Sequence, residues 1–329
     1  MKYKIALAGS TDHTVQMAEV LARDSRFDII FTLSPAPKAS GREQVVSKNP
    51  LHQWSLEQKI PSLLLEKKIN KDLQDIITTK DKKIDFLLVV DFGYLVPKWL
   101  LDWPQIAPLN IHPSLLPKWR GSSPGQFALL MQDLEADGHH SAVTLMVMNE
   151  GLDQGPIIAQ LPLQISTNWT QKEYYHEAFA LISTQLGDLI SNFAQGKIKA
   201  QAQALESPTI IARRLNKEDS FIAWTDLQVL MSAGSEKIKA QVDHSTLLYD
   251  LLSNEEICPN RLNQVRLLVN ASKALDPWPM LWTIVPTTKG EKRMKILASQ
   301  IQGEQLILNR VQIEGKNPCS FNECKNFIF

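Results

Sequence analysis

The chain has 329 residues, which is too long for one average domain, so two domains are expected. Apolar residues account for 44% and charged residues for 21% of the chain, and these proportions exclude a disordered polypeptide. The 35 basic side chains are balanced by 35 acidic ones, which excludes a nucleic-acid binder that depends on overall positive charge.

The N-terminal segment and the cysteines bear on the compartment of the protein. The apolar run near Met1 is far too short for a signal peptide or a membrane span, and it lacks the arginines of a mitochondrial presequence. Cys258, Cys319 and Cys324 fit neither a disulfide framework nor a zinc knuckle by number and spacing. We therefore expect a cytoplasmic protein with reduced thiols and no membrane contact.

Strands and helices alternate in the first two thirds of the chain. An apolar run over 4–8, a helical pattern over 15–23 and a second apolar run over 29–33 predict a β-α-β start. A long polar loop is expected over 34–50. Further strands are predicted over 62–65, 85–90, 107–112, 142–148 and 157–163, and one long helix, capped by Thr167 or Asn168, should end at Gly196. The alternation predicts an α/β domain with a mostly parallel sheet.

The last third of the chain has a different pattern. Residues 197–208 are polar and without periodicity, and we interpret them as a linker between one domain over 1–205 and a second over 206–329. The second region is expected to contain a helix over 261–274 and short strands over 281–285, 294–298, 305–308 and 310–313. These elements are typical of a small β domain that carries helices.

Three side chains form the candidate catalytic site. Asn110 and His112 lie two positions apart at the end of a predicted strand, so both point to the same face of the sheet. Pro113 should end the strand, and ligands of open parallel sheets bind beyond the carboxyl ends of the strands. Asp153 lies between Gly151 and Gly155, in a loop from which a carboxylate can reach the imidazole. Taken singly, each residue also has an ordinary structural interpretation as a cap, a satisfied polar group or a turn former.

The segment that follows Asn110 resembles a known family. Residues 112–121, His-Pro-Ser-Leu-Leu-Pro-Lys-Trp-Arg-Gly, are similar to the signature of the 10-formyltetrahydrofolate-dependent formyltransferases, and residues 151–155 resemble the Gly-Leu-Asp-x-Gly loop of that family at a matching distance. The resemblance implies a Rossmann-like catalytic domain in which Asn110, His112 and Asp153 are catalytic. It also implies that 10-formyltetrahydrofolate donates the formyl group and that no metal takes part. The folate would lie against Ser114, Leu115, Leu116, Pro117, Phe92, Gly93 and Tyr94.

Other segments resemble the methionyl-tRNA formyltransferase branch of the family. These are Lys-Trp-Arg-Gly over 118–121, the stretch from 216 to 224, and Asp-Pro-Trp-Pro-Met over 276–280. The resemblance covers essentially the whole chain, with an insertion over about 233–260. It implies an OB-like β-barrel that binds tRNA, and initiator methionyl-tRNA as the acceptor in translation initiation. Candidate tRNA contacts are Lys38, Arg42, Lys48, Arg213, Arg214, Lys292 and Arg293, and we expect a monomer.

The sequence also departs from the family in ways that keep other acceptors open. Glu43 follows Arg42 in a loop that is more basic in the family, Phe127 replaces an arginine, and Asp91 begins a segment that is Ala-Tyr-Gly in the family. The alternatives are transfer to an amino sugar nucleotide or to glycinamide ribonucleotide, and hydrolysis of the formyl-folate. A catalytically silent binding protein is a further alternative, which intact Asn110, His112 and Asp153 argue against.

Overall fold

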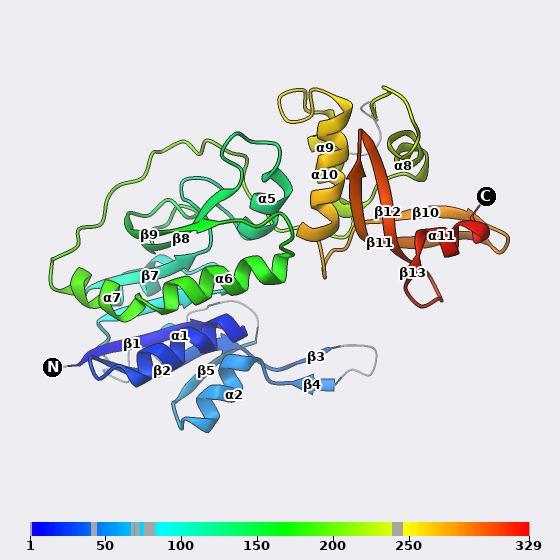
Figure 1. Ribbon diagram of the computed structural model, residues 1–329. Helices are drawn as coiled ribbons and strands as arrows, with labels where there is room; N and C mark the ends of the chain where they lie inside the picture. The colour runs from blue at the N-terminus through cyan, green and yellow to red at the C-terminus, as the bar shows by residue number, and fades with distance from the viewer. Residues whose placement is uncertain are drawn as a thin grey trace. The chain divides into compact units, whose positions relative to one another are not determined.

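The computed structural model describes residues 2–40, 45–66, 69, 73–75, 83–238 and 246–328 (Figure 1). The chain forms two compact units. The first unit comprises Met1–Arg120, Ala142–Leu163 and His176–Ile211, and the second comprises Gly121–Ser141, Gln164–Tyr175 and Ala212–Phe329. The chain therefore leaves and re-enters the first unit twice before it enters the second unit for the rest of its length. The division at residue 205 stays a prediction about independently folding domains.

The first unit is built on a seven-stranded sheet of order β5-β2-β1-β6-β7-β8-β9. Its strands are β1 (Tyr3–Gly9), β2 (Phe27–Pro35), β5 (Ser62–Leu65), β6 (Phe86–Val90), β7 (Ala107–His112), β8 (His140–Val147) and β9 (Ile157–Gln164). β1 pairs in parallel with β2 and β6, β2 with β5, and β6 with β7, whereas β8 is antiparallel to β7. The predicted α/β fold with a mostly parallel sheet is confirmed. The whole of β6 is buried, which explains its uninterrupted apolar sequence.

Helices and a small hairpin complete this part of the chain. The helices are α1 (Asp12–Arg23), α2 (Pro50–Glu57), α4 (Lys98–Leu101), α5 (Pro124–Met131), α6 (Gln171–Ser183) and α7 (Leu186–Ala194). Of these, α5 and the first residues of α6 belong to the second unit. Part of the predicted loop over 34–50 instead forms two short antiparallel strands, β3 (Lys38–Ser40) and β4 (Val45–Ser47).

The predicted single helix that ends at Gly196 is wrong, because α6 and α7 are separate. The hydroxyls of Ser183 and Thr184 donate hydrogen bonds to the carbonyls of Ala180 and Leu181, at 2.7 and 2.8 Å, and such local bonds compete with a continuing helix. The predicted cap is also displaced. Thr170, not Thr167 or Asn168, precedes the helix, and its backbone N–H donates to the Glu173 carboxylate at 2.6 Å.

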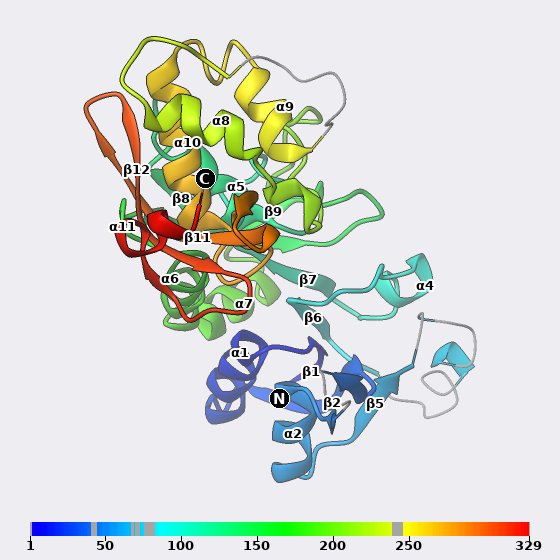
Figure 2. The same ribbon diagram turned by 90° about the vertical axis from the view of Figure 1, so that its right-hand side faces the viewer.

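The second unit contains a four-stranded antiparallel sheet of order β10-β11-β12-β13. Its elements are β10 (Trp282–Thr287), β11 (Gly290–Gln302), β12 (Gln305–Ile313), β13 (Cys319–Ser320), α8 (Trp224–Met231), α9 (Leu247–Ser253), α10 (Arg261–Ala274) and α11 (Phe321–Cys324). The predicted helix over 261–274 is confirmed as α10, which packs against α5, α8 and β11 (Figure 2). The strands predicted over 305–308 and 310–313 are one strand, β12, whose pairing with β11 shifts in register on both sides of Ala298, once by a residue of β11 and once by the β12 residue between Leu308 and Arg310.

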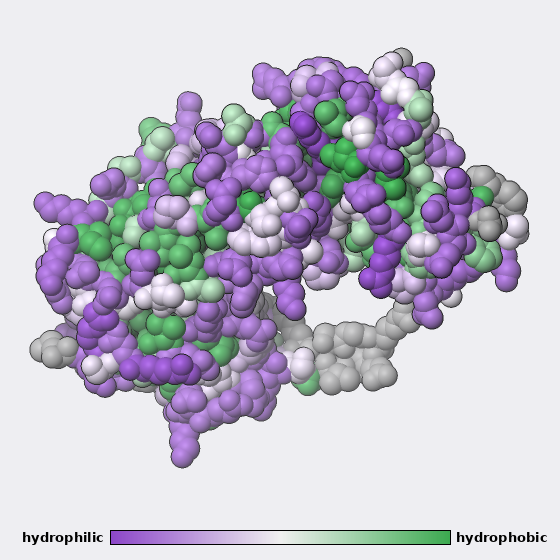
Figure 3. Space-filling model, viewed as in Figure 1, coloured by the Kyte–Doolittle hydropathy of each residue, from purple (hydrophilic) through white to green (hydrophobic). Residues whose placement is uncertain are grey.

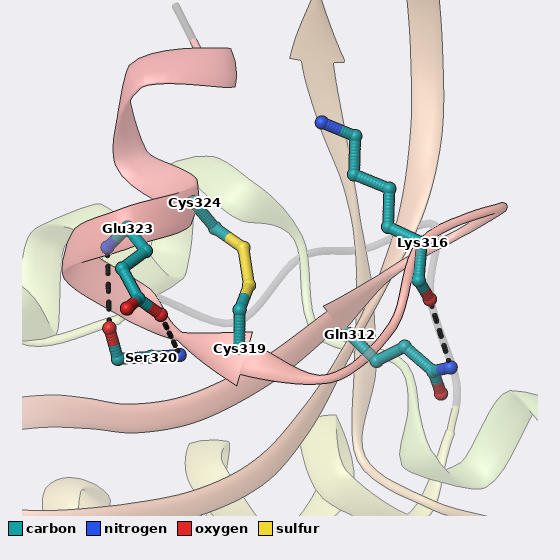
Figure 4. Close-up of a disulfide and its surroundings, with 6 residues drawn as sticks. All are labelled: Gln312, Lys316, Cys319, Ser320, Glu323 and Cys324. Carbon is teal, nitrogen blue, oxygen red and sulfur yellow. Dashed lines mark hydrogen bonds between the residues drawn. A yellow bond between two sulfur atoms is a disulfide. The ribbon is translucent and has the colours of Figure 1, made fainter.

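The expectation of three reduced thiols is wrong for two of them. Cys319 and Cys324 form a disulfide, and Cys258 is a buried free thiol (Figure 4). The physical reason is local. Ser320 caps α11 by accepting a hydrogen bond from the Glu323 N–H, while the Glu323 carboxylate accepts one from the Ser320 N–H. This capping box turns the chain after β13, so that one helical turn returns Cys324 to Cys319.

The surface is mainly polar on the face shown in Figure 3, where apolar side chains form smaller areas among hydrophilic ones. Over the ranges described, no helix has the length and apolar character needed to cross a membrane.

Candidate active site

The end of strand β7 carries the first two candidate residues. β7 lies between β6 and β8, with Asn110 opposite Val89 on one side and His112 opposite Thr144 on the other. Asn110 is half-buried and His112 is 4% exposed. The strand ends after His112, so both side chains occupy the carboxyl edge of the parallel strands, where ligand sites of such sheets lie.

The structure brings His112 and Asp153 together. His112 Nε2 lies 3.0 Å from the carbonyl oxygen of Trp119, and His112 Nδ1 lies 3.8 Å from Asp153 Oδ2. Because a carbonyl oxygen only accepts, Nε2 carries a proton and donates a hydrogen bond to the Trp119 carbonyl. One ring nitrogen is thus anchored to the main chain, and the other faces the carboxylate.

The loop that presents Asp153 has an unusual backbone. Asp153 has a φ of 50°, in the left-handed region that non-glycine residues rarely adopt. A side chain at Gly155 would collide with the Val147 carbonyl oxygen, so this position needs glycine. The amide of Gln203 donates to the carbonyl oxygens of Asp153 and Gly155, at 2.9 and 2.7 Å. The carboxylate is therefore presented by a loop whose main chain is held from outside.

The turn after His112 is fixed by hydrogen bonds to its backbone. Ser114 Oγ donates to the Lys118 carbonyl at 2.7 Å, and Thr144 Oγ1 donates to the Ser114 carbonyl at 2.6 Å. Gln160 Nε2 donates to the Leu116 carbonyl at 2.9 Å. The Ser114 and Leu116 side chains are buried, whereas Leu115 and Pro117 are only half-buried. Of the four residues predicted to contact folate in this turn, two shape it and two keep accessible surface.

The other predicted folate segment follows β6. Phe92 and Tyr94 are half-buried, with ring centroids 5.3 Å apart, and Gly93 is exposed. Since β6 and β7 are parallel neighbours, the segments that follow them leave the same edge of the sheet.

Arg120 is a buried cation beside this site. It is 2% exposed, and its guanidinium donates to the carbonyls of Ala204 and Leu205 and to Gln203 Oε1, at 2.6, 2.9 and 2.9 Å. Burial lowers the pKa of Arg120, and the negative charge of Asp153 partly opposes this shift by favouring the charged guanidinium. Residues 203–205, in the segment interpreted as a linker, are thus bonded to the first unit.

A second polar cluster at the sheet edge was missed by the sequence analysis. Asp91, at a φ of 47°, accepts a hydrogen bond from Thr11 Oγ1 at 2.9 Å. Burial raises the pKa of Asp91, partly offset by the charge of His13, by Thr11 and by the charge of His112. Burial also lowers the pKa of His13. The available signal was Asp91 itself, a carboxylate where the resembled family has alanine.

The predicted tRNA contacts have different surroundings. Arg42 lies outside the described residues, as does the side chain of Lys38, while Lys48 and Arg214 are exposed. Arg213 is engaged by Asp219, with 2.6 Å between Nη2 and Oδ1. Lys292 is half-buried, and the Arg293 guanidinium lies 4.6 Å from the centroid of the Trp282 ring. Among the predicted contacts whose side chains the structure describes, Lys48 and Arg214 are exposed and take no part in the ion pair with Asp219 or the ring contact with Trp282.

The adjacent histidines 139 and 140 show no metal-site geometry. His139 Nε2 contacts Asp133 Oδ1 at 3.0 Å, and His140 is exposed. In the part of the chain that the structure describes, no group of three or more His, Cys, Asp or Glu side chains is arranged to hold a metal ion.

Known proteins share both the sequence pattern and the fold of this chain. Residues 2–181 match the family described as formyl transferase. A methionyl-tRNA formyltransferase of Bartonella henselae is 27% identical over 302 residues, which are 92% of this chain and 82% of that protein. A methionyl-tRNA formyltransferase of Listeria innocua is 31% identical over 223 residues, 68% of each chain.

Among solved structures, the N-formyltransferase of Helicobacter canadensis, crystallised with folinic acid and dTDP-3-aminofucose, has the same fold. It covers 94% of this chain with 95% of its own, at a TM-score of 0.56 and 17% identity. The family match extends over more than half of the chain, and the Listeria relative is above 30% identical across two thirds of both sequences. The chain belongs to the formyl transferase family, among the methionyl-tRNA formyltransferases.

Proposed function

We propose that the chain transfers the formyl group of 10-formyltetrahydrofolate to the free amino group of initiator methionyl-tRNA. The observation that carries this proposal is the His112–Asp153 pair, 3.8 Å apart, beside Asn110 at the carboxyl edge of β7. Acyl transfer to an amine needs stabilisation of the oxyanion and a path for the amine proton. An amide donor and an imidazole can supply the first, and a carboxylate can supply the second.

The reaction begins when the acceptor amine attacks the formyl carbon. A C–N bond to the amine forms, and the carbonyl electron pair moves to oxygen. Asn110 Nδ2 donates a hydrogen bond to this oxygen, and His112 Nδ1, when it carries a proton, adds a second donor to the same developing charge. His112 is 4% exposed, and a hydrogen bond to a developing charge is stronger in such buried surroundings than in water.

Collapse of the intermediate breaks the bond from the formyl carbon to N10 of the folate. The amine loses one proton and N10 gains one, so the transfer is balanced without an added reactant. Asp153, opposite His112 Nδ1, holds the imidazole and relays the amine proton through water. The anchored Nε2 of His112 keeps its proton throughout, because it is bonded to the Trp119 carbonyl.

Folate is expected to lie against the half-buried Leu115 and Pro117 and the Phe92–Tyr94 segment, which offer apolar and aromatic surface at the edge of the sheet. Ser114 and Leu116 support this surface from beneath. The fold relative from Helicobacter canadensis was crystallised with folinic acid, a formyl-folate, which is consistent with this class of donor.

For the acceptor, the similarity to two methionyl-tRNA formyltransferases favours tRNA over a small amine. Residues 206–329 hold 15 basic and 14 acidic side chains, so the attraction must come from a local surface. We expect Lys38, Arg42, Lys48, Arg213, Arg214, Lys292 and Arg293 to contribute, with Arg213 least free because Asp219 holds it. Phosphate contacts of this kind make binding weaken steeply as salt increases.

The test is formyl transfer from 10-formyltetrahydrofolate to charged initiator and elongator methionyl-tRNA, with uncharged tRNA, a dTDP-amino sugar, glycinamide ribonucleotide and no acceptor as controls. Labelling of initiator methionyl-tRNA, with a KM for tRNA that rises with salt, supports the proposal. Labelling of the amino sugar or of glycinamide ribonucleotide would move the acceptor to a small amine, and folate turnover without acceptor would indicate a hydrolase. No turnover and no labelling at all would contradict the proposal.

A further inference from the structure

Gln203 connects a buried arginine to the loop that carries Asp153. Both ends of its side-chain amide are used: Oε1 accepts from Arg120 Nη2 at 2.9 Å, and Nε2 donates to the carbonyl oxygens of Asp153 and Gly155 at 2.9 and 2.7 Å. A primary amide suits this place, because its oxygen can accept from a cation while its NH2 group donates to two carbonyls.

These contacts close a ring around the reacting pair. His112 Nε2 is bonded to the Trp119 carbonyl, and Trp119 precedes Arg120 in the chain. Arg120 is bonded to Gln203, and Gln203 to the Asp153 carbonyl. Asp153 Oδ2 then faces His112 Nδ1 at 3.8 Å. His112 and Asp153 are thus connected twice, directly through their side chains and indirectly through Trp119, Arg120 and Gln203. Gln203 makes two of the hydrogen bonds on the indirect route.

The loop needs such a support because its backbone is not in a preferred conformation. Asp153 has a φ of 50°, in the left-handed region that few residues other than glycine, Asn and Asp adopt. Bonds to the loop main chain stabilise this conformation, and Gln203 makes two of them, one on Asp153 and one two residues later. The position of the Asp153 carboxylate therefore depends on a residue fifty positions away in sequence.

We infer that Gln203 is a positioning residue, which with Arg120 holds the 151–155 loop so that Asp153 faces His112. The inference rests on the proposed roles of Asp153 and His112. It assigns a function to the 197–208 segment, whose sequence predicts only a linker. Gln203 touches no reacting atom, and its effect passes through the Asp153 main chain.

Two substitutions distinguish the contribution of the amide oxygen of Gln203 from that of its NH2 group. Gln203→Leu removes all three hydrogen bonds at similar size, whereas Gln203→Glu keeps an acceptor for Arg120 and loses the donor to the loop carbonyls. Gln201→Leu is the matched control, because Gln201 is exposed and lies two residues earlier in the same segment. Thermal unfolding of each variant checks that it folds.

Both Gln203 variants should lower kcat by about 10²-fold, as expected when a catalytic group is displaced by about 1 Å, with the acceptor KM unchanged. In an Asp153→Asn background, Gln203→Leu should cause no further loss, because its route to the reaction has already been removed. Retention of wild-type kcat by Gln203→Glu, or an undiminished effect of Gln203→Leu beside Asp153→Asn, would overturn the inference.

Amide hydrogen exchange over 151–155 tests the same inference without turnover. Exchange in these residues should accelerate in both Gln203 variants and stay at the wild-type rate in Gln201→Leu. Unchanged exchange in the Gln203 variants would refute a positioning role. If the unmodified protein transfers no formyl group, the proposed function fails, and the exchange experiment still decides whether Gln203 holds the loop.

Discussion

Arg120 in the first unit and Arg261 in the second are equally buried, at 2% and 3% exposed. Arg261 holds only main-chain segments together, whereas Arg120 also supports the loop that carries Asp153. Arg261, the first residue of α10, donates to four carbonyl oxygens, those of Leu230, Ser232, Glu236 and Glu304, at 2.6 to 3.1 Å. Those four acceptors belong to main chain alone. Arg120 also satisfies carbonyls, but one of its bonds goes to Gln203 and from there to the loop of Asp153. The same chemistry supports the fold in one region and a reaction site in the other.

The largest expected effect concerns the three candidate catalytic residues, of which His112 and Asp153 lie at the end of the Arg120 network. Asn110→Ala, His112→Ala and Asp153→Ala should each lower kcat by about 10²–10³-fold or more, because each removes a group that stabilises the transition state or moves its proton. The proteins should remain folded by circular dichroism, which serves as the control. Near wild-type turnover by any of the three would remove that residue from the proposed mechanism.

Next in size is the contrast between the arginines themselves. Arg120→Met and Arg261→Met should each cost about 3 kcal/mol in the free energy of unfolding, because buried carbonyls lose a charged donor. Arg120→Met should also lower kcat by about 10²-fold through the displaced loop, whereas Arg261→Met should leave kcat per folded molecule unchanged. Urea unfolding and steady-state kinetics measure the two quantities. A fall in kcat for Arg261→Met would break the comparison.

A smaller effect is expected from Asp219, a buried carboxylate in the second unit. Burial alone would raise the pKa of Asp219, but bonds from Arg213 and from the backbone N–H groups of Asn216 and Leu247 outweigh it, and the pKa is lowered. Such a carboxylate stabilises the fold above its unfolded pKa, and the contribution is lost as pH falls through the lower folded value.

The wild-type free energy of unfolding should therefore decline below about pH 4. Asp219→Asn should cost about 2 kcal/mol at neutral pH and then lose less on acidification, with kcat unchanged. Urea unfolding over a pH series measures this difference. Equal acid slopes for the two proteins would show that Asp219 does not carry the effect.

The smallest expected effect comes from the disulfide at the end of the chain. Replacing Cys319 and Cys324 by serine should cost about 2 kcal/mol or less, since the bridge closes a loop of only a few residues, and kcat should not change. Thermal unfolding with and without dithiothreitol measures this loss of stability. The melting temperature of the double-serine protein should be the same with and without the reductant. A loss of turnover on reduction would link this end of the chain to the reaction.

Features that depend on local pattern could be predicted from the sequence. Strand β7 was predicted over 107–112 as observed, because the apolar run is ended by Pro113, and the period of two put Asn110 and His112 at its end. The helix predicted over 261–274 is observed over the same residues, and the structure adds that Asn260 caps its start. The meeting of His112 and Asp153, 41 positions apart, was suggested by the glycines around Asp153, and the family resemblance then singled out the pair.

Features that depend on distant partners could not be predicted. Gln203 forms a hydrogen bond with Arg120, 83 positions away, and the polar sequence around Gln203 contains no pattern that predicts this partner. Ser183 and Thr184 are compatible with a helix as well as with its end, and their hydroxyl bonds decide the outcome only in three dimensions. The disulfide depends on a capping box, which cysteine counting does not consider.

The place of β7 in the interior of the sheet limits how this protein can change in length. β6 and β8 fix the register of β7 on both sides, so the insertion or deletion of one residue within it would turn Ile111 toward the site and bury an amide and an imidazole in the core. Length variation is therefore compatible with exposed connections between elements and incompatible with the six residues that end at His112.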